Sequence, residues 1–211
     1  MRRIFVNPAR PHRDAVQEAA KLIRAGAVIA IPTDTLYGLA ADPFSPAAVQ
    51  RVFDVKGRGG DRPLPLIAAD VAQIAAHLGA LPKTVARLGD TFWPGPLTML
   101  IAAPASLAPQ VAAGTGRVGV RVPDNPVARA VCQAVGRPIT ATSANISDEP
   151  ATSDPDVVEN TLGDRIELLI DGGRTRGGPA STIIDVTVDP PALVRAGAIP
   201  WEQVQACVAS A

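Results

Sequence analysis

Four polar sites in this sequence lie at the end of, or within, an apolar run, where α/β proteins usually carry their chemistry. They are residues 32–39 (PTDTLYGL), 56–62 (KGRGGDR) and 140–145 (TATSAN), together with Arg121 inside the run VGVRVP. Each segment also has a plain alternative, which is a turn whose Thr, Ser or Asp side chains bond their own backbone, or a solvated basic loop. No one of them identifies a function alone.

The basic segment is typical of an anion-binding loop. Lys56, Arg58 and Arg62 place three cations within seven residues, and glycines crowd the stretch up to Pro63. These cations repel one another unless an anion lies between them, and the glycines let backbone amides approach the same anion. We expect Lys56, as a loop residue, to add little to the packing of the fold.

The remaining polar positions suit a small ligand with charged groups. Residues 140–145 offer hydroxyl and amide groups without bulk. Arg121, inside a strand, either pairs with a buried acid or binds a ligand carboxylate. Ser181 and Arg195, in later strands, leave the same two interpretations open.

Common nucleotide motifs give no support for a standard ATP site. Residues 114–119 spell G-x-G-x-x-G, but the residues that follow alternate as a strand and not as the helix that a dinucleotide fingerprint needs. The chain has no G-x-x-x-x-G-K-[ST], H-E-x-x-H or G-x-S-x-G motif.

Alternating helical and strand-like segments position these sites, and strands that follow one another late in the chain favour a mixed parallel and antiparallel sheet. We therefore expect one α/β domain over residues 1–211, with a twisted mixed sheet flanked by helices, a core at about 12–197 and a short helical extension at 198–211. Expected helices cover 11–24, the segment opened by Ser45-Pro46, 70–79, 82–92, 126–135, 153–163 (capped by Ser153, with Asp156 three residues on) and the end after Pro200. Expected strands cover 4–6, 27–31, 64–68, 97–102, 118–122, 138–142, 167–171, 182–186 and 192–195.

Composition narrows the function classes. Lys plus Arg equals Asp plus Glu, 20 against 20, and aromatic residues make up 3%, which argues against a surface that binds nucleic acid stably. Cys132 and Cys207 are expected to be reduced thiols, and His12 and His77 are too isolated for a zinc site. Without a signal-like or membrane-spanning run, the chain is expected to be soluble and cytoplasmic.

Taken in order, the motifs resemble those of the YrdC family, the threonylcarbamoyl-adenylate synthases. The matching pieces are 32–39 (PTDTLYGL), Lys56-x-Arg58, 93–98 (WPGPLT), 120–123 (VRVP), 142–147 (TSANIS) and 181–185 (STIID). Together they extend over nearly the whole chain.

The resemblance implies a basic cavity that holds ATP, L-threonine and bicarbonate, with Mg²⁺ on the phosphates and no metal bound by the protein itself. Family members form a threonine carbamate that attacks the α-phosphate of ATP and releases pyrophosphate. A separate complex then transfers the threonylcarbamoyl group to tRNA, to the adenosine next to the anticodon.

The resemblance also implies roles for particular residues. The catalytic tetrad corresponds to Lys56, Arg58, Ser143 and Asn145. The ATP-binding positions are Arg58, Arg62, Arg117 (through its side chain or its backbone), Ser143 and Arg195. The threonine-binding positions are Thr35, Arg121, Ala141 (through its backbone) and Ser181.

Four positions depart from the family pattern: Arg62, Ile67, Asp148 and Ala151. Longer relatives of the family carry a linker and a second domain, and we expect any lid that these supply to be missing here or to come from elsewhere. Two alternatives stay open, a carbamoyl-transfer relative that uses carbamoyl phosphate and a noncatalytic RNA-binding module.

Overall fold

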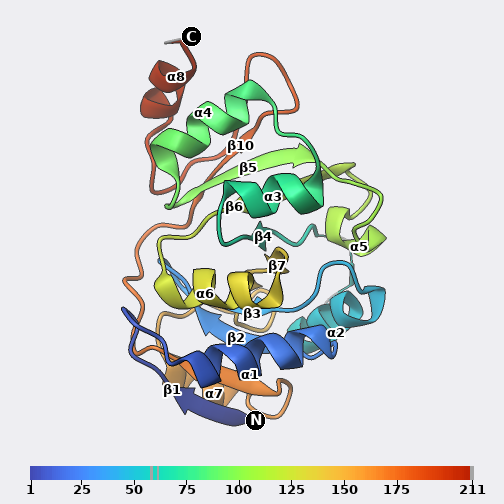
Figure 1. Ribbon diagram of the computed structural model, residues 1–211, viewed down its shortest axis with the longest axis vertical. Coiled ribbons are helices and arrows are strands. Elements are labelled where there is room, and N and C mark those ends of the chain that lie inside the picture. The colour runs from blue at the N-terminus through green and yellow to red at the C-terminus, as the bar shows by residue number, and fades with distance from the viewer. Residues whose placement is uncertain (58, 61, 210–211) are drawn as a thin grey trace.

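The apolar runs form the strands of two sheets, one in each half of the molecule (Figure 1). The computed structural model describes residues 1–57, 59–60 and 62–209. The lower half in Figure 1 holds a five-stranded sheet with both parallel and antiparallel pairs. Its order is β1 (Arg2–Phe5), β9 (Leu168–Asp171), β2 (Ile29–Pro32), β3 (Tyr37–Ala40) and β8 (Thr142–Ser143).

The upper half holds a six-stranded sheet, which is also mixed. Its order is β11 (Ala192–Arg195), β10 (Thr182–Asp185), β5 (Leu97–Ala102), β6 (Arg117–Arg121), β4 (Leu66–Ile67) and β7 (Ile139–Thr140). The α/β class and the mixed pairing are confirmed, and so is the rejection of residues 114–119 as a dinucleotide motif, because strand β6 begins within them, at Arg117, where such a motif needs a helix.

The mixed sheet that we expected is divided into two sheets, and the division lies at Ala141. The run expected as one strand over 138–142 is divided: Ile139 pairs with Ile67 in one sheet, and Thr142 pairs with Leu39 in the other. Between them, the Ala141 amide donates to Pro65 O at 2.9 Å. The chain therefore passes from one sheet to the other within a single residue.

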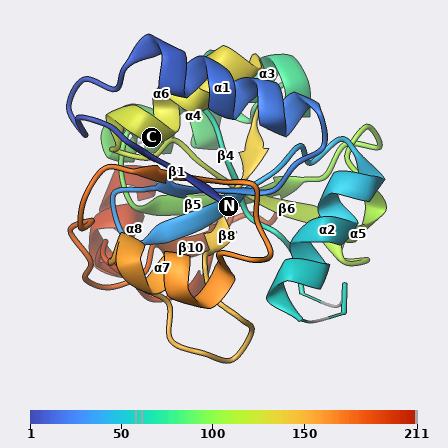
Figure 2. The same cartoon turned by 90° about the horizontal axis from the view of Figure 1, so that it is seen from below.

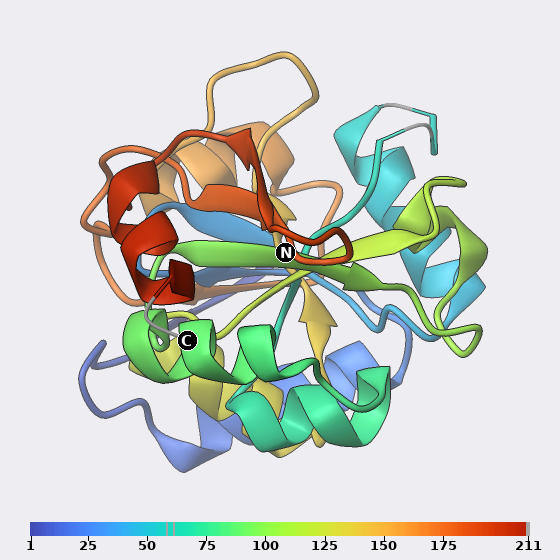
Figure 3. The same ribbon diagram turned by 90° about the horizontal axis from the view of Figure 1, so that it is seen from above.

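Helices cover the sheets from both sides. Figures 2 and 3 show α1, α3, α4 and α6 together on one side and α7 on the opposite side. The helices of the described residues are α1 (Arg13–Arg24), α2 (Pro46–Lys56), α3 (Val71–Leu78), α4 (Lys83–Phe92), α5 (Pro109–Ala112), α6 (Pro126–Val135), α7 (Pro155–Leu162) and α8 (Trp201–Ala209). None of them is long and apolar enough to cross a membrane.

Capping side chains explain where several helices begin. Ser45, Asp70 and Asn125 each accept a hydrogen bond from a backbone amide three residues on, which satisfies a donor that the first turn leaves open. The expected cap at Ser153 is wrong by one residue. Asp154 caps α7 by accepting from Asp156 N at 3.0 Å, and Pro155 then occupies the first helical position.

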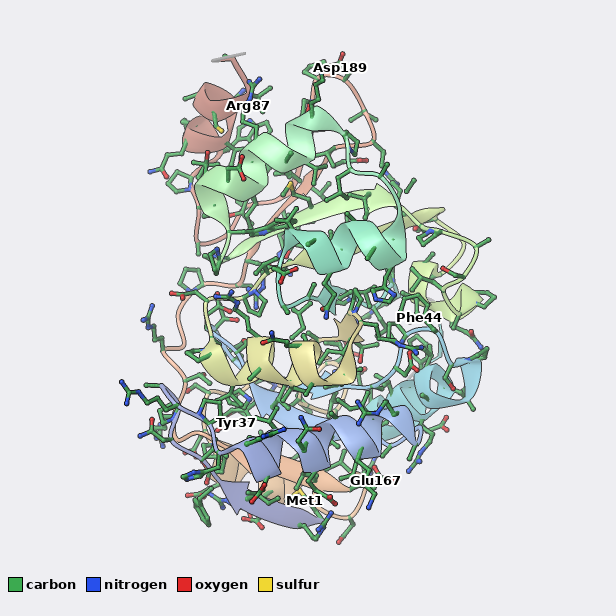
Figure 4. The ribbon with its side chains drawn as sticks, in the orientation of Figure 1. Met1, Tyr37, Phe44, Arg87, Glu167 and Asp189 are labelled. Carbon is green, nitrogen blue, oxygen red and sulfur yellow. The ribbon has the colours of Figure 1, made fainter. Side chains whose placement is uncertain are left out.

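The buried core consists of Val, Ile, Leu and Ala more than of aromatic residues, as the composition indicates. It includes Val204 of α8, which is fully buried, so the C-terminal helix packs onto the domain. Arg87 of α4, labelled in Figure 4 beside α8, donates to Val208 O at 3.2 Å. Cys132 is buried, Cys207 is partly buried, and both are free thiols.

Candidate active site

Lys56 is the last residue of α2, and its side chain points into the protein. The helix ends at Gly57, whose φ of 64° lies in the left-handed region that glycine adopts without strain. Lys56 is 2% exposed. The expectation of a loop lysine with little packing is therefore wrong, because the helix continues one residue further than the glycine-rich stretch suggests.

The Lys56 ammonium binds the segment that follows β7. Its Nζ donates to Ser143 O at 2.7 Å, to Asn145 O at 2.9 Å and to Asn145 Oδ1 at 3.1 Å. An ammonium has three N–H donors, so these oxygens are enough to engage all of them. Two motifs 87 residues apart are thus joined at one buried cation.

Asn145 extends this network into the following turn. Its Nδ2 donates to Glu149 O at 2.6 Å and to Ile146 O at 2.9 Å. Ser147 N returns to Lys56 O at 2.9 Å. Lys56 and Asn145 therefore fix the backbone around Ser143, whose own hydroxyl has no hydrogen bond to any residue that the structure describes.

The other cations of the glycine-rich stretch are placed differently. Arg62 pairs with Asp148 at 3.2 Å, with 58% and 77% of the two side chains exposed, as in a weak surface ion pair. Arg58, predicted for both catalysis and ATP binding, lies outside the described residues.

A second group of charges meets between the two sheets. Arg121 ends β6 of the six-stranded sheet, and Asp34 lies in the β2–β3 turn of the five-stranded sheet. Arg121 Nη2 is 3.0 Å from Asp34 Oδ1, and the two side chains are only 9% and 5% exposed. Burial lowers the pKa of Arg121, the Asp34 carboxylate raises it, and the neighbouring Arg195 lowers it. Of the two interpretations left open for Arg121, pairing with a buried acid is the one seen here.

Ser181 and Arg195 lie in the same group. Ser181 Oγ accepts from Thr98 Oγ1 at 2.9 Å and from Arg195 Nη2 at 3.2 Å. Arg195 also donates to Ser181 O at 2.7 Å, and partial burial lowers the pKa of Arg195. Because Ser181 Oγ already accepts twice, its proton is the part left for a ligand.

The Thr35 hydroxyl differs from that of Ser181, because its free function toward a ligand is to accept a hydrogen bond. Thr33 Oγ1 donates its proton to Leu36 O at 2.7 Å, so the 3.1 Å contact between Thr33 Oγ1 and Thr35 Oγ1 requires Thr35 to donate. The Thr35 hydroxyl therefore offers a ligand an acceptor. Its backbone oxygen is held by Thr175 Oγ1 at 2.7 Å and by Gly177 N at 2.9 Å.

Ala141 and Arg117 complete the predicted set. Ala141 has only backbone to offer, as expected, and lies where the chain changes sheets. Arg117 begins β6 and lies about 13 Å along the strand from Arg121. Its side chain pairs with the buried Asp185. Burial would raise the pKa of Asp185, but hydrogen bonds from Thr187 and the charge of Arg117 outweigh it and lower that pKa.

The structure thus brings the predicted residues into two groups that share the start of β3. The Lys56 group reaches β3 through Ser143, which pairs with Gly38. The Arg121 group reaches it through Asp34. The side chains of Arg62 and Arg117 belong to neither group.

Sequence reasoning assigned no role to Asp34 or Ser147. Asp34 Oδ1 and Ser147 Oγ are buried and have no hydrogen-bond partner among the described residues. Both occur inside the quoted motifs, at Thr33-Asp34-Thr35 and at the end of 142–147. Their position inside these motifs was the signal from which the sequence could have identified them as site residues.

A hollow of about 400 Å³ lies elsewhere, near the ends of β1 and β9. Its lining mixes acids and bases, including Arg3, Asp154, Asp171 and Arg174, and contains none of the predicted site residues. Arg3 is bound there by three carboxylates. We place the candidate site at the converging motifs, because buried polar atoms that make no hydrogen bond to any described residue lie there.

The fold and these groups define a class, an α/β protein in which polar side chains from several strand ends and loops meet around one place, as ligand-binding sites of such folds do. The chain belongs to the Sua5/YciO/YrdC family, whose model, described as "Telomere recombination", matches residues 21–197. The family resemblance predicted from the motifs is confirmed.

Relatives of known name are similar over most of this chain. The threonylcarbamoyl-AMP synthase of Bacillus subtilis is 39% identical over 92% of the chain, which spans 56% of that protein. The synthase of Vibrio campbellii is 32% identical over 80% of the chain and is itself 92% covered.

A solved structure has the same fold. The crystal structure of Pyrococcus abyssi Sua5 complexed with L-threonine matches with a TM-score of 0.92 and 36% identity. The match covers 98% of this chain and 61% of that one. The chain therefore spans little more than half the length of the Bacillus and Pyrococcus relatives.

Proposed function

We propose that this protein is a threonylcarbamoyl-AMP synthase, a nucleotidyltransferase. It joins L-threonine, bicarbonate and ATP into threonylcarbamoyl-AMP and pyrophosphate. The observation that carries the proposal is the joining of two family motifs by the buried Lys56 ammonium, at Ser143 and Asn145. Relatives named for this reaction, which are similar over most of the chain, support it.

The amino acid binds at the Arg121 group. Arg121 is suited to a carboxylate because its guanidinium offers planar paired donors in a buried setting. Ser181 adds a hydroxyl proton, Thr35 adds an acceptor for the side-chain hydroxyl or the amine, and Ala141 adds backbone groups. The Pyrococcus relative was solved with L-threonine bound, which supports an amino-acid site in this fold.

The phosphates of ATP bind beside Ser143. Its hydroxyl is held toward them by a backbone that Lys56 and Asn145 fix. Lys56 contributes positive charge from its buried position, Arg58 and Arg62 contribute from the glycine-rich stretch, and Arg195 contributes from β11. Arg117 reaches ATP through its backbone, since its side chain is paired with Asp185. Mg²⁺ enters with the phosphates as part of the substrate.

The chemistry needs placement more than a protein nucleophile. The threonine ammonium first loses a proton to solvent, and the resulting amine forms a bond to the carbon of bicarbonate; water leaves, and a carbamate results. A carbamate oxygen then attacks the α-phosphorus, and the bond from that phosphorus to pyrophosphate breaks. Fixed cations stabilise the charge that gathers on the leaving phosphates, and close approach of the reactants lowers the barrier further.

The product is passed on. We propose a cytoplasmic role in which a separate threonylcarbamoyl-transfer complex takes the adenylate and modifies tRNA next to the anticodon. Direct, stable binding of nucleic acid by this chain is not part of the proposal, given its balanced charge.

Pyrophosphate release tests the proposal. The purified protein is incubated with ATP, Mg²⁺ and bicarbonate, with and without L-threonine. We expect release that needs both threonine and bicarbonate. Folded protein that binds ATP and releases no pyrophosphate would contradict the proposal and favour the carbamoyl-phosphate-using relative.

A further inference from the structure

We propose that Asp34 accepts a hydrogen bond from the α-ammonium group of the amino-acid substrate, and so makes the site select amino acids over analogues that lack the amine. This inference rests on the proposed function and adds a specificity-determining residue to it. It starts from a buried carboxylate oxygen, Asp34 Oδ1, that accepts no hydrogen bond from the described residues.

The burial of Asp34 Oδ1 without a hydrogen bond lowers the stability of the folded protein. The side chain is 5% exposed, and Arg121 Nη2 lies 3.0 Å from Oδ1. Despite that short distance, no N–H of the described residues makes a hydrogen bond to this oxygen. A buried charged acceptor without a hydrogen bond is destabilising, so a donor supplied by a ligand binds it favourably.

The other groups of the Arg121 group offer the ammonium no negatively charged acceptor. Arg121 and Arg195 are cations, and Ser181 Oγ already accepts two hydrogen bonds. All three are donors toward a ligand and suit its carboxylate. Thr35 offers an acceptor without charge. Asp34 is therefore the anionic acceptor within this group.

The Asp34–Arg121 pair has the charge pattern of a zwitterion. An α-amino acid carries its ammonium and carboxylate on the same carbon, so the two charges can lie against Asp34 and Arg121 together. A site built to accept an N–H in this way rejects an analogue that lacks it, because the analogue leaves the buried oxygen unpaired.

Binding measurements with two ligands test this assignment. Calorimetric titrations of L-threonine and of 3-hydroxybutyrate, which lacks only the amine, are made on the wild type, on Asp34→Asn and on Asp42→Asn. Asp42 is a matched control because it pairs with Arg137 at 3.5 Å, outside the site. Circular dichroism melts establish that each variant is folded.

We expect the wild type and Asp42→Asn to prefer L-threonine by about 100-fold or more, the size of effect that an unpaired buried polar group produces. In Asp34→Asn the preference should fall at least tenfold, mainly through weaker threonine binding. If the Asn variant does not fold, Asp34→Ser provides the same comparison of the two ligands.

Three outcomes would overturn the assignment. In the first, the Asp34 variant keeps the wild-type preference. In the second, it loses affinity for both ligands equally, which indicates only a structural role. In the third, the wild type binds no L-threonine, which overturns the proposed function as well. If the wild type releases pyrophosphate in a threonine-dependent way and Asp34→Asn keeps the wild-type preference for L-threonine, only this inference is overturned and the proposed function stands.

Discussion

Lys56 places a positive charge inside the protein. Its ammonium donates hydrogen bonds to three oxygens of Ser143 and Asn145. This use of lysine differs from a mobile cation that reaches a phosphate directly. The charge still acts on an anion nearby, because the field of a buried cation is screened less than that of a surface one. Its hydrogen bonds, however, determine where the Ser143 hydroxyl points.

Replacing Lys56 with Ala should therefore affect both stability and activity. The change leaves two backbone oxygens and Asn145 Oδ1 without their donor, which should lower the free energy of unfolding by about 2–3 kcal/mol. Loss of positioning and charge should reduce pyrophosphate release by about 100-fold. Urea denaturation and the release assay measure the two effects. The exposed Lys21→Ala is the control, and a Lys56→Ala protein as stable as the wild type would contradict this account.

Residue types in order predicted the segments that the structure brings together in the two groups, but not how those segments meet. The partners of Lys56 are mainly backbone oxygens, which carry no sequence signature. For Arg121, its type and position in a strand left two partners possible, and only the meeting of the two sheets selects Asp34. The position of Arg117 in the sequence likewise did not reveal its partner: its side chain lies four positions along β6 from Arg121 and pairs with Asp185.

At the scale of elements, the β2–β3 hairpin and the segment after β9 act together. Tyr37 begins β3 and lies in the half of the molecule that holds the five-stranded sheet (Figure 4). Its hydroxyl donates to Gly173 O at 2.8 Å and accepts from Gly172 N at 3.3 Å. A few residues later, Thr175 holds Thr35 O. Burial raises the pKa of Tyr37, so its phenol stays a neutral donor.

Tyr37→Phe should loosen this connection. Gly173 O and Gly172 N lose a partner in a partly buried place, so the free energy of unfolding should fall by about 1 kcal/mol. The KM for threonine should rise several-fold while kcat changes less, because Thr35 is held less firmly. Thr175→Val, which removes only the contact with Thr35, should change KM in the same way with a smaller loss of stability. An unchanged KM in both variants would show that this segment does not position Thr35.

Elements with strong local signals were predictable, and those that depend on distant partners were not. The bounds of α6 over 126–135 match because Asn125-Pro126 begins the helix and Gly136 ends it. Strand β3 was missed because Tyr37-Gly38-Leu39 follows a polar turn and has a glycine in its interior, which weakens the strand pattern. The two-residue strands β7 and β8 arise only through pairing with strands far away in the chain.

For the whole molecule, acid sensitivity follows from Asp185 in β10. A carboxyl group whose pKa is lowered by folding stabilises the protein above its unfolded pKa, near 4, and that contribution is lost as the pH falls through the lower, folded value. Asp185→Asn should therefore reduce stability at pH 7 by about 1–2 kcal/mol. The difference from the wild type should shrink below about pH 4.

Urea denaturation over a series of pH values measures this effect. Asn keeps an oxygen for the Thr187 amide but places an NH2 group where Asp185 Oδ2 accepts from Arg117, so the variant removes the charge and that hydrogen bond together. Asp164→Asn, at an exposed position, is the control. A constant difference between wild type and Asp185→Asn down to pH 2 would contradict the proposed cause.

The passage of the chain between sheets at Ala141 makes the site a junction between the two halves of the fold. Asp34 belongs to one sheet and Arg121 to the other, so a ligand that engages both adds its binding free energy to the contact between them. By thermodynamic linkage, occupancy then favours only those states in which the halves are joined. Substrate would thereby suppress local opening at the junction and make unfolding more cooperative, even in strands that the ligand never touches.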